Sequence, residues 1–277
     1  MSEPEIAGDG KHEPPTPKAP LDPNEGKSLE IELGGDGYWA RIPIQTELFA
    51  RGDTLAEKVT SYVTDITELA AADERFHAGF GEKWYVVVSE KIVAISQGRS
   101  YFTWEINPGA PAKVLSKFVQ RTPYGIGLGS PWTMQLAINE AGLPRIVAAA
   151  GASVVGKLLG RKGWFYHVAG HRVNAIDGPT SYSAYPSNVS AKLPPKDPDQ
   201  VAGQISAAVR EAVPDELAKT FGGTVVIDSN DLGRDVLGHD TDRVIEFFCD
   251  LFGDNPFGQG RQQTPIAICL PVADPKE

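Results

Sequence analysis

The sequence is poor in cysteine, and this excludes two kinds of stabilisation. Its two cysteines, Cys249 and Cys269, have no partner histidine close to them along the chain. They form neither a disulfide framework nor a zinc site. One lies in an amphipathic helical pattern and the other in an apolar strand pattern, so we expect two buried free thiols.

Positive charge is also scarce. The 277 residues hold 26 Lys and Arg against 36 Asp and Glu, a net charge of −10. Nucleic acids and anionic membranes are bound through clustered Lys and Arg, so this balance argues against both as partners. A small phosphate-bearing ligand remains compatible, because a local basic pocket or a divalent cation held by carboxylates is enough to bind it.

Long apolar runs are missing as well. The most apolar run, residues 146–159, is interrupted by Gly151, Gly156 and Lys157, and a membrane-spanning helix needs roughly 20 apolar residues. We therefore expect a buried helix there. The first residues do not show the charged and then apolar pattern of a signal peptide, so the protein is predicted to be cytoplasmic.

The composition that remains is ordinary for a globular protein, with 41% apolar and 22% charged residues. Residues 1–27 differ, because they hold six of the 22 prolines and no aromatic residue. Such a segment cannot bury enough apolar surface to offset its ordering entropy. We expect a disordered, Pro-rich acidic tail over residues 1–27. One domain then covers residues 28–277, either undivided or made of two subdomains that meet near residues 160–195.

Hydrophobic periodicity predicts strands and helices that alternate along this domain. Strands are expected at residues 31–33, 38–49, 84–89, 164–168, 224–227 and 265–270, and helices at 53–69, 132–141, 145–159, 197–209 and 241–252. Asp53 is expected to cap the first helix, and Pro43 indicates an edge position or a strand end. The alternation predicts an α/β (α+β) fold with a mixed β-sheet and flanking helices.

Polar clusters follow several of these strands, where α/β folds bind their ligands. Ser89-Glu90-Lys91 offers a lysine that can reach a phosphate, or it simply begins a helix. Asp177, which precedes Gly178, is a candidate metal ligand, although Asp-Gly-Pro is also common turn chemistry.

Two further clusters lie near the C-terminus. Residues 228–231 (DSND) place two carboxylates and an amide at a strand end, which suits a divalent cation with nucleotide phosphates or the cap of a helix. Residues 258–264 (GQGRQQT) combine glycines, which let backbone amides approach a ligand, with the amide of Gln263. A plain hairpin connection would look similar.

The order of these clusters matches the motifs of one known family. The matching segments are RIPI (41–44), VVVSEKIVAISQGR (86–99), AID (175–177), LPPKDPD (193–199), VVIDSNDLGR (225–234) and QTPIAI (263–268). The sequence therefore resembles the coenzyme F-420-0:L-glutamate ligase (F-420 gamma-glutamyl ligase) family, as a divergent branch, over nearly all of the chain beyond residue 38.

The resemblance implies a GTP-dependent ligase, with ATP as the alternative nucleotide. Such an enzyme phosphorylates a carboxylate of an acceptor, such as the F-420 precursor, and joins it to L-glutamate through a γ-glutamyl link. The resemblance also implies Mg²⁺ or Mn²⁺, with K⁺ as a further candidate. It implies a homodimer, for which the Gly- and Ala-rich helices over residues 132–159 supply an apolar surface.

The resemblance also assigns residues to roles by position. Lys91 and Asp177 are the implied catalytic residues. The implied metal ligands are Asp177, Asp228, Asn230, Asp231 and Gln263. The implied nucleotide contacts are Ile42, Pro43, Ile44, Gln45, Glu90, Lys91, Asn188 and Gln263.

Three positions depart from the family pattern. Asn230 stands where the family has a metal-binding aspartate, so Asp228 or Asp231 must supply the charge. Ile95 replaces a second lysine, and a longer loop after Asp177 makes Asn188 the nearest match to the family's asparagine. Two alternatives stay open: a γ-glutamyl ligase for a folate-like acceptor, and a non-catalytic homologue that binds a nucleotide or metabolite.

Overall fold

The computed structural model describes residues 17–119, 127–161, 163–178, 189–230, 233–258 and 260–274. These residues form two compact units. We call residues 17–97 and 195–274 the sheet unit and residues 98–194 the helical unit. The sequence predicts one domain, or two subdomains that meet near residues 160–195, whereas the contacts within the chain place the boundaries at Gly98 and Pro194.

The sheet unit is built on six strands in the order β1-β2-β8-β3-β6-β7. Among the paired neighbours of this sheet only β3 and β6 are parallel, so the sheet is mixed and the predicted fold class is confirmed. The strands are β1 Glu30–Glu32, β2 Tyr38–Ile44, β3 Trp84–Ser89, β6 Phe221–Asn230, β7 Gly233–His239 and β8 Ile266–Val272.

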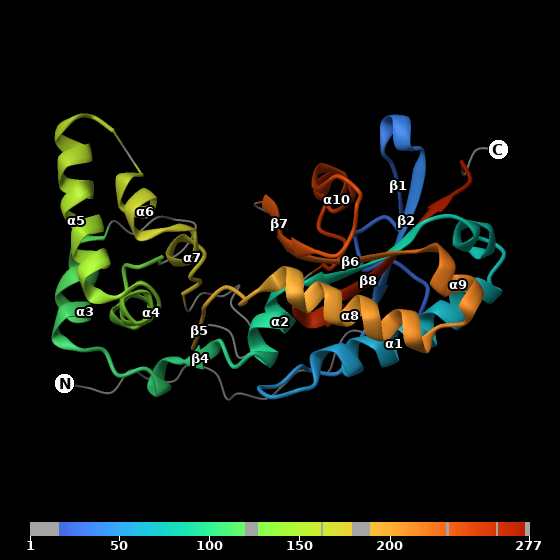
Figure 1. Ribbon diagram of the computed structural model, residues 1–277, viewed down its shortest axis with the longest axis horizontal. Coiled ribbons are helices and arrows are strands. Elements are labelled where there is room, and N and C mark those ends of the chain that lie inside the picture. Colours follow the sequence, from blue (N-terminus) through green and yellow to red (C-terminus); the bar gives the residue numbers. More distant parts are fainter. Residues whose placement is uncertain are drawn as a thin grey trace. The chain divides into compact units, whose positions relative to one another are not determined.

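Helices cover both faces of this sheet (Figure 1). α1 Leu55–Ala72 and α8 Pro198–Ala212 pack on one face, against alternate strand residues such as Ile42, Val86 and Val226. α10 Ile245–Leu251 packs on the other face, against Tyr85 and Val87. Because side chains alternate across a strand, every central strand contributes to both clusters. Burial contributes about 1.5–3 kcal/mol per large apolar side chain.

Short elements connect these layers. They are α2 Glu90–Ser96, which follows β3, α9 Asp215–Thr220, which precedes β6, and the 3₁₀ turns η1 Gly34–Asp36, η2 His77–Gly81 and η5 Gly260–Gln262. The two cysteines are free: Cys269 is buried in β8, and Cys249 on α10 is half-buried. Burial raises the pKa of both thiols, so both stay protonated and neither is an activated nucleophile.

Pro43 lies at an open edge, as its type predicts. β1 pairs only with the first part of β2, from Tyr38 to Ala40. Beyond that point β2 has one neighbour, β8, in which Ala267 stands opposite Pro43. A proline lacks the N–H that a second neighbour would require, which explains why β1 stops before it.

The predicted cap of α1 by Asp53 is wrong. The N-cap residue is Thr54, and its side chain makes no capping hydrogen bond. Asp53 instead accepts hydrogen bonds from the Ala50 N–H and the Lys58 Nζ, at 2.9 and 2.8 Å. These bonds lower the pKa of its carboxyl. Asp53 therefore holds the loop before α1 and one lysine of the helix, rather than the helix end.

The chain contacts the sheet unit earlier than the composition indicates. Asn24 is 3% exposed and its Nδ2 donates to the Pro256 carbonyl and to Thr264 Oγ1, both at 2.8 Å. Leu21 packs against the core beneath β2. Contacts with the rest of the fold thus begin before Ser28, the position at which ordered structure is expected to start.

The helical unit has a two-stranded sheet of β4 Ser100–Phe102 and β5 Ser190–Lys192. Its helices are α3 Ala110–Leu115, α4 Pro131–Ala141, α5 Leu143–Leu158, α6 Trp164–Ala169 and α7 His171–Asn174, with the turns η3 Thr103–Glu105 and η4 Ser116–Phe118. Their core holds Met134, Ile146 and Val173. The helices expected over 132–141 and 145–159 are confirmed as α4 and α5.

The strand expected over residues 164–168 is wrong, because these residues form helix α6. Gly163, in the left-handed conformation, precedes the helix, and Gly170 follows it. Among the described residues no single helix is long and apolar enough to span a membrane. α4 and α5 reach that length and apolarity only when taken together, across a bend of 115°.

Candidate active site

The ends of three strands meet at one edge of the sheet unit beside β6, and most of the predicted site residues lie there. Ile266 at the start of β8 pairs with Ile44 on one side and Val88 on the other. Ser89, which ends β3, pairs in parallel with Ile227 of β6. The carboxyl ends of β2 and β3 therefore lie in one row with the start of β8 and with Ile227 of β6, beyond which β6 continues to Asn230. In α/β folds such an edge is where ligands bind.

The turn before β8 is tied to the end of β2. The Thr46 N–H donates to the Gln263 carbonyl at 2.9 Å, and Gln45 Nε2 donates to the Gln262 carbonyl at 2.9 Å. Gln263 has a φ of 50°, a backbone conformation that is strained for residues other than glycine. Held strain of this kind is often found at binding sites.

Three of the predicted nucleotide contacts lie inside the protein. Ile42 and Ile44 are at most 1% exposed and belong to the main core, and Pro43 is buried between them. Gln45 is the half-exposed residue of this segment. The segment therefore presents an amide side chain and backbone groups at the edge, not its aliphatic side chains.

The Ser89-Glu90-Lys91 cluster begins helix α2 directly after β3. Ser89 is the N-cap, and its Oγ accepts a hydrogen bond from the Lys91 N–H at 3.4 Å. Glu90 is 4% exposed, whereas Lys91 is half-buried. Of the two charged side chains the lysine is thus the one with access to solvent at the strand ends. Ile95 packs partly against the core, which explains an apolar residue at that place.

Asp228 and Asn230 lie within a β-hairpin, which differs from the predicted cluster beyond a strand end. β6 continues through them and pairs with β7, with Asp228 opposite Asp235 and Asn230 opposite Gly233. Asn230 Nδ2 donates to Asp228 Oδ1 at 3.4 Å, and its Oδ1 accepts from the Gly233 N–H at 3.1 Å. Neither residue caps a helix. Asp231, a predicted metal ligand, lies outside the described residues.

The donors on this hairpin fit a cation that is bound jointly with phosphates. Asp228 and Asp235 stand directly opposite each other, so the hairpin carries two carboxylates at neighbouring positions. Mg²⁺ typically uses one or two carboxylates together with phosphate oxygens. In the part of the chain that the structure describes, no three His, Cys, Asp or Glu side chains gather as a metal site. A cage made of protein ligands alone is therefore not found there.

Asp177 belongs to the helical unit, whereas the residues above belong to the sheet unit. It forms an isolated bridge with Lys192, with two backbone hydrogen bonds of 3.0 and 2.9 Å. Its Oδ2 lies 3.3 Å from Lys192 Nζ; the Asp177 side chain is 58% exposed, whereas that of Lys192 is 4% exposed. The carboxylate thus has solvent access and a buried cationic neighbour. Asn188 lies outside the described residues.

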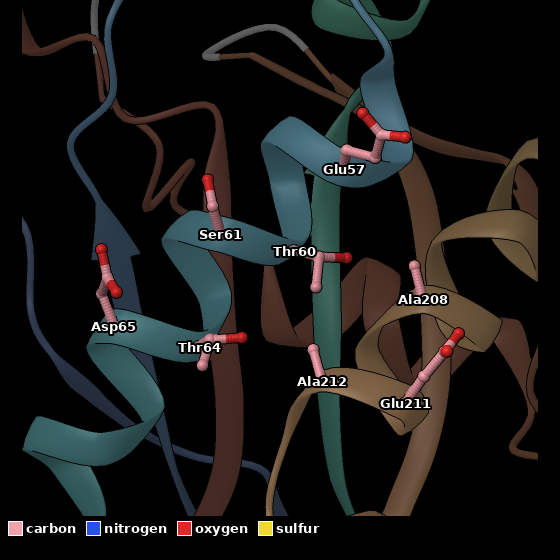
Figure 2. Close-up of a pocket in the computed structure, with 8 residues that line it drawn as sticks. All are labelled: Glu57, Thr60, Ser61, Thr64, Asp65, Ala208, Glu211 and Ala212. Carbon is pink, nitrogen blue, oxygen red and sulfur yellow. The ribbon is translucent and has the colours of Figure 1, made fainter.

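Figure 2 shows an open groove of about 470 Å³ between α1 and α8. Carboxylates and hydroxyls line it together with two alanines: Glu57, Thr60, Ser61, Thr64, Asp65, Ala208, Glu211 and Ala212. It holds none of the predicted site residues. Because it lies between helices on one face of the sheet, rather than at the strand ends, we do not place the chemistry there.

Sequence reasoning missed several residues that shape these regions. Lys192 is recognised as a neighbour of Asp177 only from the bridge between them. Asp235 is recognised as a neighbour of Asp228 only from the pairing of β6 with β7. Arg99, the last residue of the QGR segment, joins Glu140 at 3.0 Å and donates to the Pro194 carbonyl. An arginine next to the boundary between the units is the only local signal for such a contact. The sequence does not identify its partners, Glu140 and Pro194, because both are far from Arg99 along the chain.

Comparison with known proteins relates the chain to a known family. The family model described as F420-0:Gamma-glutamyl ligase matches residues 43–231, which include the end of β2, all of β3, the Asp177 bridge and all of β6. No curated protein matches the chain.

Proposed function

Because the chain belongs to the F420-0:gamma-glutamyl ligase family, we propose that it joins the amine of L-glutamate to a carboxylate of an acceptor such as the coenzyme F-420 precursor. GTP, or ATP in its place, drives the reaction. An acceptor carboxylate oxygen attacks the terminal phosphorus, and the nucleoside diphosphate leaves. The glutamate amine then attacks the acyl carbon, and the phosphate departs as the amide forms.

The observation that carries this proposal is the row of strand ends at one edge of the sheet unit. We assign the phosphates to the start of α2, where Lys91 supplies a positive charge at the end of β3. The amides of Gln45 and Gln263 orient the nucleotide at the neighbouring ends of β2 and β8. These groups act by positioning and by opposing negative charge, which is most of what phosphoryl transfer requires.

Asp228, with Asn230 and Asp231, is the proposed metal-binding segment of the sheet unit, and Asp177 is a proposed metal ligand of the helical unit. A bound Mg²⁺ or Mn²⁺ would neutralise phosphate charge there. Asn230 contributes an oxygen but no charge, so the segment depends on its aspartates. We also propose that the purine nucleotide binds only together with the divalent cation. Calorimetry with GTP should then show heat with Mg²⁺ and none with EDTA; tight binding in EDTA contradicts the assignment.

Activity is tested by mass spectrometry of reactions that contain L-glutamate, GTP or ATP, and candidate acceptors. An acceptor product heavier by one glutamyl residue supports the ligase, and product from a folate-like acceptor alone would redirect the substrate. Asp177→Asn is expected to abolish phosphate release that depends on glutamate and acceptor, and Asn230→Asp to change it modestly.

A second candidate is a homologue that binds the nucleotide without ligation. Two departures favour it: Asn230 in the metal-binding segment, and Ile95 packed against the core where the family has a lysine. In that case the wild type shows no glutamate-dependent phosphate release, and Asn230→Asp creates some. Wild-type turnover in Asp177→Asn would instead show that the site is placed wrongly.

A further inference from the structure

Charge is segregated between the two units, and the net charge of the chain conceals this. Residues 98–194 hold ten Lys and Arg against three Asp and Glu, a net charge of +7, whereas the rest of the chain holds 16 against 33, a net charge of −17. From residue 141 to 176 there is no acidic residue at all, against five Lys and Arg. The argument from net charge against an anionic surface therefore does not apply to the helical unit.

The same unit exposes most of the large apolar side chains. Thirteen of them are exposed among the described residues, and nine belong to residues 98–194. Six lie on α5 or at its end: Leu143, Val147, Val154, Val155, Leu158 and Leu159. The opposite side of α5, with Ile146, Ala149 and Gly156, is buried in the unit. α5 is thus apolar on both sides, but only one side is buried in the unit. Its other apolar face is exposed in the part of the chain that the structure describes, and such a face is typical of an interaction site.

The exposure peaks where α5 turns into α6. Leu158 is 82% exposed and Leu159 63%, and the exposed cations Lys157 and Arg161 stand on either side of them in the sequence. α5 and α6 lie side by side (Figure 1), and the ring of Trp164 approaches α5 closely at Gly156. We call residues 157–161 the hairpin tip.

The hairpin tip is held by backbone hydrogen bonds. The Arg161 N–H donates to the Gly156 carbonyl at 2.7 Å, and the Gly160 N–H to the Lys157 carbonyl at 3.2 Å. Gly160 has a φ of 69°. This is a Schellman end, which satisfies the last carbonyls of a helix and fixes the direction of the chain. The two leucines are thus fixed in an exposed position by a regular structure.

We propose that the hairpin tip docks the protein on an anionic lipid surface. Leu158 and Leu159 enter the interface, the valines of α5 extend the apolar contact, and Lys157 and Arg161 meet the phosphates of the headgroups. Apolar area and electrostatic attraction to anionic lipids add in such binding. The leucines account for the apolar part, and the +7 charge of the unit for the preference for negative lipid.

A second copy of the chain is the competing occupant, since a homodimer through residues 132–159 is expected from the sequence. In a symmetric contact, equivalent patches face each other. The basic stretch of one copy would then lie against the basic stretch of the other, with no acidic residue between positions 141 and 176 to pair with it. An anionic bilayer supplies the opposite charge that the equivalent stretch of a second copy lacks in a symmetric contact.

The test is co-sedimentation of the full chain with phosphatidylcholine vesicles, with and without phosphatidylglycerol. Wild type should bind the anionic vesicles, release them as salt rises, and leave neutral vesicles largely unbound. Leu158→Ser with Leu159→Ser should lower the bound fraction about tenfold. Leu69→Ser is the matched control, because Leu69 is an exposed leucine, 49% exposed, on α1 of the sheet unit. It should bind like wild type.

Arg161→Gln separates the two contributions. It should weaken binding to anionic vesicles and leave the small binding to neutral vesicles unchanged. Circular dichroism and turnover without vesicles should match wild type in all these variants, so the outcome is independent of the proposed ligase reaction. The proposal fails if wild type ignores anionic vesicles or if the leucine variant binds as well as wild type. It also fails if light scattering shows a dimer that the leucine variant dissociates.

Discussion

Gln263 shows how much of the candidate site depends on the conformation of one residue. Its carbonyl accepts from the Thr46 N–H, which joins the turn before β8 to the end of β2. Its φ of 50° is one that glycine adopts easily and other residues adopt at a cost. An amide side chain therefore occupies a position where glycine would be less strained, and we interpret this as a functional role for the amide.

This interpretation predicts different responses to two substitutions. Gln263→Gly and Gln263→Ala both remove the amide, but only glycine relieves the positive φ. The glycine variant should be more stable than the alanine variant by about 1 kcal/mol, measured by urea unfolding. Both should lose turnover. Equal stabilities would show that the backbone is not strained at Gln263. Full turnover in both variants would show that the amide has no role in the site.

At the scale of the element, β7 is the feature that most changes the interpretation of the sequence. It pairs with β6 and turns the acidic cluster into a hairpin. Near its end Gly238 lies against the start of α8: a Cβ added there would overlap the backbone of Pro198 and Asp199. The Asp199 carboxylate also accepts from the His239 N–H at 2.9 Å. β7 therefore positions α8 as well as Asp228.

Gly238→Ala should separate α8 from β7, with a loss of about 1–3 kcal/mol in the free energy of unfolding, as for other overpacked sites. Gly233→Ala is the matched control in the same strand, because an added Cβ at Gly233 meets nothing within 4 Å. Its change should stay within about 0.5 kcal/mol. Urea denaturation of the two variants checks this, and a tolerant Gly238 would contradict the close packing.

The elements differ in how well their sequences predict them, for physical reasons. WYVVVS predicts β3 to the residue, because a central buried strand is apolar throughout. GRDVLGH does not predict β7. It forms an edge strand, most of whose residues are exposed or half-buried, so its sequence lacks the apolar pattern of a strand. WFYHVA resembles a strand in composition, but packing beside Gly156 and two flanking glycines make it helix α6. Short aromatic runs do not decide between the two by pattern alone.

The candidate site was predictable only in part. The motif residues at the ends of β2, β3 and β8 share an edge, as residues that follow neighbouring strands should. What the sequence could not show is which side chains remain accessible there. Ile42 and Ile44 are core residues, and the partner of Asp177 is a buried lysine fifteen positions away. The burial of the two isoleucines and the partner of Asp177 both depend on contacts between residues that are distant in sequence. Such contacts leave no pattern in the local sequence.

For the whole molecule the main fact is that one unit is inserted into the other. Gln97 Nε2 donates to the Lys196 carbonyl at 2.8 Å, and the Lys196 N–H donates to Gln97 Oε1 at 2.7 Å. On the other side of the boundary, the Leu193 N–H donates to the Arg99 carbonyl at 2.9 Å. The two crossings of the chain thus lie beside each other, as in tolerated domain insertions.

Removal of residues 98–194, with Gln97 joined to Pro195 through a short glycine-serine bridge, should leave a folded sheet unit. Both of its core clusters consist of residues outside the deleted segment. Circular dichroism and a cooperative thermal transition check the fold. Nucleotide-driven ligation should be lost, because Asp177 goes with the deletion. An unfolded product would show that the sheet depends on the helical unit.

The insertion also sets the order of events while the chain is being made. β2 and β3 leave the ribosome first, but β3 finds its neighbours only in β6 and β8, on the far side of the inserted segment. Translation at about 5–20 residues per second needs roughly 5–20 s for those hundred or so residues. For that time β3, a central strand that is buried along almost its whole length, lacks the strands with which it pairs. The helical unit is synthesised completely before the sheet can form. The newly made chain therefore needs protection until β6 and β8 are available to pair with β3.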